Sequence, residues 1–88
     1  INHINSDDIK QLIRASGSVG ANYIEANDSL SKKDFTMRIK ICRKEAKECI
    51  YWLNLLQEKN INLIKEAQEI TNIFGAIVRK LEQSSLKN

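Results

Sequence analysis

The chain has no proline and only three glycines among its 88 residues. Proline breaks helices and glycine weakens them, so their scarcity favours long, uninterrupted helices. Aromatic residues, which are enriched in strands, make up only 6% of the chain. No apolar run approaches the roughly 20 residues that cross a bilayer as a helix. The sequence therefore predicts a soluble, all-α protein without a membrane-spanning segment.

The length of the chain and its two cysteines limit its architecture and its compartment. A chain of 88 residues forms at most one domain, so we expect a single helical-bundle domain over residues 1–88. A domain of this size buries only about 60 to 65% of its unfolded surface, which makes association with further copies favourable. Cys42 and Cys49 lie about 10 Å apart along one predicted helix, too far for a disulfide. We expect reduced, buried thiols and a cytoplasmic protein.

Periodicity and capping signals predict three helices, at about residues 6–26, 32–58 and 62–83. Ser31, followed by Asp34 three residues later, resembles a capping box at the start of the second helix. Connections as short as those between the predicted helices force neighbouring helices to run antiparallel. The expected fold is therefore an up-and-down antiparallel helical bundle.

Two of the predicted helices carry clear apolar stripes. The stripe of the second helix is Phe35, Ile39, Cys42, Ala46, Cys49, Leu53 and Leu56. The third helix has a heptad seam, which consists of Leu63, Ala67, Ile70, Phe74, Ile77 and Leu81. The bulky run from Ile50 to Leu53 adds more apolar surface than a three-helix core needs. We therefore expect a fourth helix, either upstream of Ile1 or from a partner chain.

The first predicted helix has two faces that could contact other helices. Its apolar stripe, predicted to face the core, is Ile9, Leu12 with Ile13, Ser16, Val19 with Gly20, and Tyr23 with Ile24. A second, polar stripe consists of Arg14, Ser18, Asn22 and Glu25, whose spacing places them on one side of the helix. Buried polar groups need partners, so we interpret the polar stripe as a helix–helix or subunit contact rather than a catalytic constellation.

Basic residues gather in the second predicted helix. Residues 32–47 carry seven basic and two acidic side chains. The candidate nucleic-acid-binding residues are Lys33, Lys40, Arg43, Lys44 and Lys47. A basic stripe can follow a phosphate backbone, but it is more often an ordinary solvated face. No aromatic residue lies among these lysines to stack on bases, so both interpretations stay open.

Residue types that carry catalysis or bind metals are scarce. Glu45 and Glu48 are a carboxylate pair on one helix, but di-metal bundles use Glu-x-x-His motifs, and the only histidine is His3. Cys42 and Cys49 lack further soft ligands for zinc. The sequence contains no phosphate-binding loop, nucleophile elbow or Cys/His pair. We expect no enzyme, no catalytic or metal-binding residues, no cofactor and no small-molecule substrate.

Three segments together resemble the 23S rRNA intervening-sequence protein family, also called four helix bundle proteins. The first segment matches the family pattern R-x-x-x-S-x-x-x-N-x-x-E through Arg14, Ser18, Asn22 and Glu25. Residues 31–35 resemble the family's S-x-K-[DE]-F motif at the start of the next helix, and Glu48 matches a downstream glutamate. The resemblance covers residues 10–56.

The resemblance implies a non-enzymatic, self-associating four-helix bundle. Family members of known structure are up-and-down bundles that form cyclic homopentamers, and some are encoded within insertions in bacterial 23S rRNA genes. A related protein, the accessory protein of diversity-generating retroelements, is a basic pentameric barrel that works with a reverse transcriptase and nucleic acid. We therefore expect a homo-oligomer that binds RNA or another nucleic acid. The alternative is a purely structural oligomer or protein-binding adaptor.

The chain departs from the family pattern in two ways. Typical members carry a whole helix before the one that begins near Ser6, and this chain has no room for it. Several members also have apolar residues where this chain has Arg38, Arg43 and Lys44. The second helix is therefore more basic than is usual, which favours an anionic partner.

Overall fold

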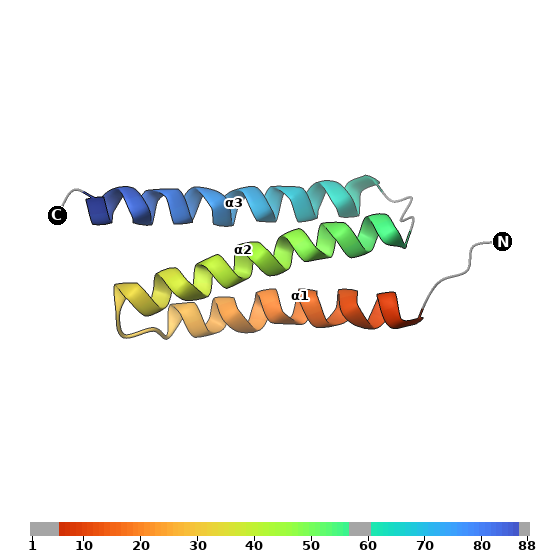
Figure 1. Ribbon diagram of the computed structural model, residues 1–88, viewed down its shortest axis with the longest axis horizontal. Helices are drawn as coiled ribbons and strands as arrows, with labels where there is room; N and C mark the ends of the chain where they lie inside the picture. Colours follow the sequence, from red (N-terminus) through yellow and green to blue (C-terminus); the bar gives the residue numbers. More distant parts are fainter. Residues whose placement is uncertain (1–5, 57–60, 87–88) are drawn as a thin grey trace.

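The computed structural model describes residues 6–56 and 61–86, which form three antiparallel helices. They are α1 (Ser6–Asn27), α2 (Lys32–Leu55) and α3 (Ile61–Leu86). Figure 1 shows α2 between α1 and α3 in an elongated molecule that measures 57 × 20 × 15 Å. The described residues contain no strand. The predicted all-α, up-and-down arrangement is confirmed, with three helices present.

The helix ends follow local capping chemistry. Ser31 adopts an extended conformation, and its Oγ accepts a hydrogen bond from the backbone N–H of Asp34 at 3.1 Å. At the end of α1, the Ser29 hydroxyl donates to the carbonyl of Glu25 at 3.0 Å. The predicted bounds agree with the helices to within one to three residues for α1 and α3. The prediction for the second helix is too long: α2 ends at Leu55 with Leu56 as its C-cap, three residues before the predicted end at Glu58, which itself lies outside the described residues.

The predicted apolar stripe of α2 forms the centre of the core. Ile39, Cys42, Ala46, Cys49 and Leu53 are all buried, while Phe35 and Leu56 are half-buried. One continuous cluster joins the three helices through Ala26, Ile39, Cys42, Ala46, Phe74 and Val78. Both cysteines are free thiols within or beside this core. As the middle helix, α2 buries its apolar stripe without a fourth helix.

The predicted core stripe of α1 is wrong for most of its residues. Ile13 is 64% exposed, and Ile24 is exposed to a similar extent. Tyr23 is also exposed, although its ring contacts Phe74 of α3 with the centroids 6.2 Å apart. Leu12 and Val19 are half-buried. The exposed members of the predicted stripe are Ile9, Ile13, Ser16, Gly20, Tyr23 and Ile24.

The small and polar side of α1 lies against α2 instead. Ala15 and Ala26 are buried there, and Ser18 and Asn22 are half-buried between them. Among the described helices, α2 is the only one whose backbone lies close to the backbone of α1. Small residues permit this close approach, whereas the bulky Ile13 and Ile24 on the other side of α1 are exposed. The size of the apolar side chains therefore does not predict which face of α1 is buried.

The heptad seam of α3 is only partly buried. Phe74 is buried, and Ala67, Ile77 and Leu81 are half-buried, but Leu63 and Ile70 are exposed. The buried residues described in α3 are Thr71, Phe74, Gly75 and Val78, and Phe74 and Val78 belong to the core cluster with α2. The seam is thus turned partly away from α2, toward the open side of the molecule.

An apolar groove of about 360 Å³ opens between α1 and α3. Its walls come from all three helices, with Leu12 of α1, Leu53 of α2 and Leu63 of α3 among them. Among the described residues that line it, only Ser16 and Glu66 have polar side chains. No helix in the described residues is both long and apolar enough to span a membrane.

Candidate helix contacts and nucleic-acid interface

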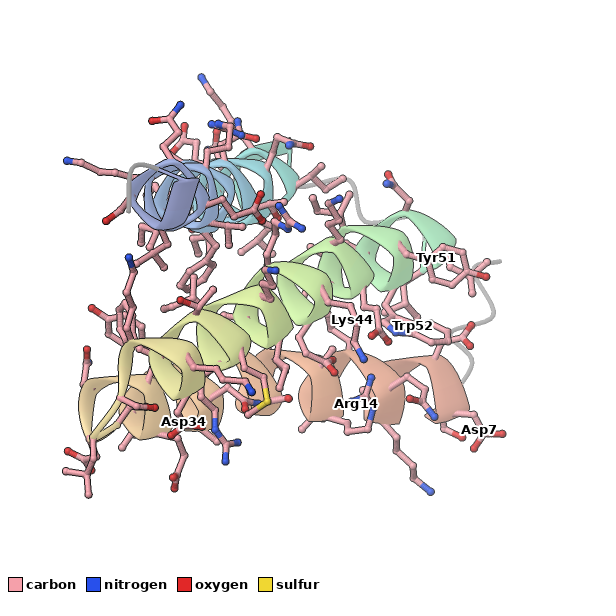
Figure 2. All side chains as sticks on the ribbon, turned by 60° about the vertical axis from the view of Figure 1, so that its left-hand side comes forward. Asp7, Arg14, Asp34, Lys44, Tyr51 and Trp52 are labelled. Carbon is pink, nitrogen blue, oxygen red and sulfur yellow. The ribbon has the colours of Figure 1, made fainter. Side chains whose placement is uncertain are left out.

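Arg14 joins α1 to two carboxylates of α2. Its Nη1 donates to Glu45 Oε2 at 3.2 Å, and its Nη2 donates to Glu48 Oε1 at 2.9 Å. Its Nε donates to Gln11 Oε1 at 3.0 Å on the same helix. The Glu45 side chain is only 8% exposed, whereas Arg14 is 47% exposed. Arg14 therefore neutralises a buried charge from the edge of the interface (Figure 2).

Asn22 forms the second polar contact between these helices. Its Oδ1 accepts from Arg38 Nη1 at 3.1 Å, while its Nδ2 donates to the carbonyl and the hydroxyl of Ser18. The amide of Asn22 thus links its own helix to α2. Arg38 Nε is buried and has no hydrogen-bond partner. The loss of Asn22 would leave more of this guanidinium unsatisfied.

The polar stripe predicted on the first helix therefore has contacts within the chain. Arg14, Ser18 and Asn22 face α2, whereas Glu25 is exposed. A contact of this stripe with a second subunit remains a prediction.

Sequence reasoning missed the partners Arg38 and Glu45, although a signal for them exists. Residues that face each other in an antiparallel helix pair lie at equal distances from the connecting turn. Arg14 and Glu45 meet this condition, and Asn22 and Arg38 meet it to within one residue.

The two cysteines differ in their electrostatic surroundings. Burial raises the pKa of the Cys42 thiol, and Cys42 Sγ donates to the carbonyl of Val19 at 3.5 Å. Burial also raises the pKa of Cys49, and the charges of Glu45 and Glu48 add to this effect, while Arg14 opposes it. Both thiols therefore stay protonated at neutral pH. They are core residues rather than nucleophiles.

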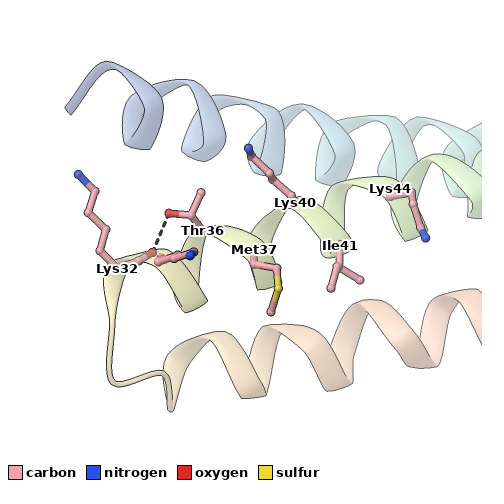
Figure 3. Close-up of a pocket in the computed structure, with 7 residues that line it drawn as sticks. Lys32, Thr36, Met37, Lys40, Ile41 and Lys44 are labelled. Carbon is pink, nitrogen blue, oxygen red and sulfur yellow. Dashed lines mark hydrogen bonds between the residues drawn. The ribbon is translucent and has the colours of Figure 1, made fainter. Parts of the chain in front are cut away.

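Four predicted nucleic-acid-binding lysines lie on the outer face of α2. Lys33, Lys40, Lys44 and Lys47 are all exposed. Figure 3 shows part of this face, where a surface pocket is lined by residues of α2 alone. Arg43, the fifth candidate, is half-buried, and its side chain lies over Gly75 of α3. The four lysines therefore share one face, from which Arg43 is separated.

Acidic partners do not neutralise this face strongly. Lys40 Nζ lies 3.5 Å from Glu82 Oε1, and both side chains are about half exposed. Lys44 Nζ is 4.0 Å from Glu45 Oε1, at the limit of an ion pair. The exposed Lys40–Glu82 pair contributes only about 0 to 1 kcal/mol. Because Glu45 and Glu48 are both paired with Arg14 of α1, the outer face remains basic.

Within residues 6–56 and 61–86, no three histidine, cysteine or acidic side chains come together in a metal-binding group.

A model of the 23S rRNA-intervening sequence protein family matches residues 6–83. No curated protein and no solved structure gives a significant match to the chain. The family match extends beyond the motifs at residues 10–56 and includes most of α3.

Proposed function

Because the chain belongs to the 23S rRNA-intervening sequence protein family, we propose that it is a self-associating helical-bundle protein that binds RNA or another nucleic acid without catalysing a reaction. The family consists of small helical proteins and is not a known enzyme family. A cytoplasmic location is part of the proposal and is supported by the two free cysteines.

The outer face of α2 is the observation that carries nucleic-acid binding. Lys33, Lys40, Lys44 and Lys47 project from a face that no other described helix covers. The glutamates of α2 that could neutralise them, Glu45 and Glu48, are both paired with Arg14, and Lys44 Nζ lies 4.0 Å from Glu45 Oε1. A row of exposed lysines whose ion pairs are weak binds phosphates through charge and the release of counterions. This mode of binding does not require base recognition.

A salt series with labelled RNA tests the proposal. Wild-type protein should bind, and the logarithm of its affinity should fall with the logarithm of salt concentration with a slope of about −3, as expected for four phosphate contacts on a single strand. The triple variant K40E/K44E/K47E should lose binding. The control K10E/K65E/K80E makes the same change in net charge at exposed lysines of α1 and α3. Absence of binding at low salt, or equal losses in both variants, would refute the proposal.

A structural oligomer or protein-binding adaptor is the second candidate function. It is supported by the apolar groove between α1 and α3 and by exposed isoleucines, of which Ile70 lines the groove. Contiguous apolar surface of this kind is typical of protein interaction sites. Under this alternative the lysine face is only solvated, and the RNA titration would show no binding.

A further inference from the structure

The basic face of α2 continues into an exposed aromatic ring. Lys40, Lys44, Lys47 and Tyr51 follow one another at intervals of four, three and four residues, which keeps them on one side of a helix. Tyr51 is 58% exposed. Figure 2 shows Lys44 and Tyr51 projecting from α2, with Tyr51 closer to its C-terminal end. Sequence analysis found no aromatic residue among the lysines because Tyr51 lies one turn beyond the basic cluster.

We propose that Tyr51 is a stacking site for an unpaired base of a single-stranded nucleic acid whose phosphates lie along Lys40, Lys44 and Lys47. The inference rests on the proposed nucleic-acid binding and adds a preference for single strands. At 1.5 Å of rise per residue, Tyr51 lies about 6 Å beyond Lys47 and about 16 Å beyond Lys40. A strand of a few nucleotides spans this distance. Such a site tolerates any sequence, because every base has a π-face.

The neighbouring Trp52 holds the Tyr51 ring in place. The two rings meet edge to face, with their centroids 4.9 Å apart and an angle of 79° between their planes. Trp52 is half-buried, so it supports the more exposed ring from the side of the protein. A ring that is already ordered loses less conformational freedom when a base stacks on it. Trp52 is the only tryptophan in the chain, so its fluorescence reports on this position.

The test compares a labelled twelve-nucleotide oligouridine with an RNA duplex of equal length. Wild-type protein should bind both, and only the single strand should change the fluorescence of Trp52. The Y51L variant should bind oligouridine about 5- to 150-fold more weakly, as expected for the loss of one stacked base. Its affinity for the duplex should not change, since paired bases are unavailable for stacking. The Y51F variant, which keeps the ring, should bind both probes like the wild type.

The outcomes separate this inference from the proposed function. If Y51L binds both probes like the wild type, or weakens both equally, the stacking site is refuted while nucleic-acid binding stands. If the wild type binds neither probe, both the stacking site and the proposed nucleic-acid binding are refuted. Circular dichroism of Y51L should match the wild type, because the replaced ring lies outside the core cluster. Loss of single-strand affinity alone, restored in Y51F, establishes the site.

Discussion

Arg14 holds two carboxylates of α2 at once, and one of them is buried. Replacing Arg14 with methionine removes the closer cation of Glu45, whose side chain is 8% exposed, and leaves Lys44 Nζ at 4.0 Å. We expect the R14M variant to lose about 1 to 3 kcal/mol of unfolding free energy, because a buried charge with a weaker partner keeps most of its desolvation cost. Urea denaturation followed by circular dichroism measures this loss.

Glu48 provides the matched comparison for Arg14. Its side chain is 37% exposed, so water solvates it when the ion pair is lost. The E48Q variant should therefore lose less than about 1 kcal/mol of unfolding free energy. The double variant R14M/E45Q removes both the cation and the buried charge and should recover part of the stability lost in R14M. Equal losses of unfolding free energy in R14M and E48Q would show that Arg14 does not stabilise the buried charge of Glu45.

The two thiols should react slowly in the folded protein. Burial raises the pKa of both Cys42 and Cys49 above the usual value of 9.0, so the reactive thiolate is scarce at neutral pH. A thiol whose folded pKa is raised adds stability below its unfolded pKa, and this stability is lost as pH rises above about 9. Labelling with an aromatic disulfide at pH 7.5 should be slow until urea unfolds the chain. Rapid labelling of the native protein would contradict their burial.

At the scale of the helix, sequence patterns predicted α2 correctly and the faces of α1 and α3 less well. The middle helix packs on both neighbours, so its broad apolar stripe is buried whether or not a fourth helix is present. An outer helix has a choice of faces, and α1 buries Ala15 and Asn22 while Ile13 and Ile24 remain exposed. Hydrophobic periodicity locates an apolar face but does not say which neighbour covers it. The exposure of the lysine face was predictable, because the other sides of α2 pack against α1 and α3.

Two glycines on α1 provide a test of which face is open. A Cβ added at Gly17 or Gly20 meets nothing within 4 Å. Glycine costs a helix interior about 0.5 to 1 kcal/mol relative to alanine, so G17A and G20A should each stabilise the isolated protomer by about that amount. The measurement is urea denaturation at a protein concentration low enough to keep the chain monomeric. A loss of stability there would mean that other parts of the same chain cover this face.

Gly75 is the internal comparison for these two positions. It is buried in α3, and a Cβ there would lie 3.4 Å from Arg79 Nη1 and 3.9 Å from Arg43 Cδ. These are ordinary contacts with flexible side chains, so G75A should be tolerated. Its gain in unfolding free energy should be smaller than that of G20A. A larger gain in G75A would contradict the exposure of the α1 face.

At the scale of the whole molecule, charge and apolar surface lie on different sides. The outer face of α2 carries the lysines, whereas the groove between α1 and α3 is lined mainly by apolar side chains. An assembly that covers the groove would therefore leave the lysines in water, available to a nucleic acid. The two parts of the proposed function, self-association and nucleic-acid binding, are thus compatible in one molecule.

Self-association through the groove is the prediction that tests this separation. We expect sedimentation velocity to show oligomers of the 88-residue chain at tens of micromolar, because its groove and flanking isoleucines expose apolar surface. Ile70 lines the groove, so the I70D variant should raise the dissociation constant at least about tenfold by placing a charge in the contact. Ile73 is also exposed on α3 but does not line the groove. I73D should therefore associate like the wild type, and equal effects of both variants, or a monomeric wild type, would exclude the groove as the contact.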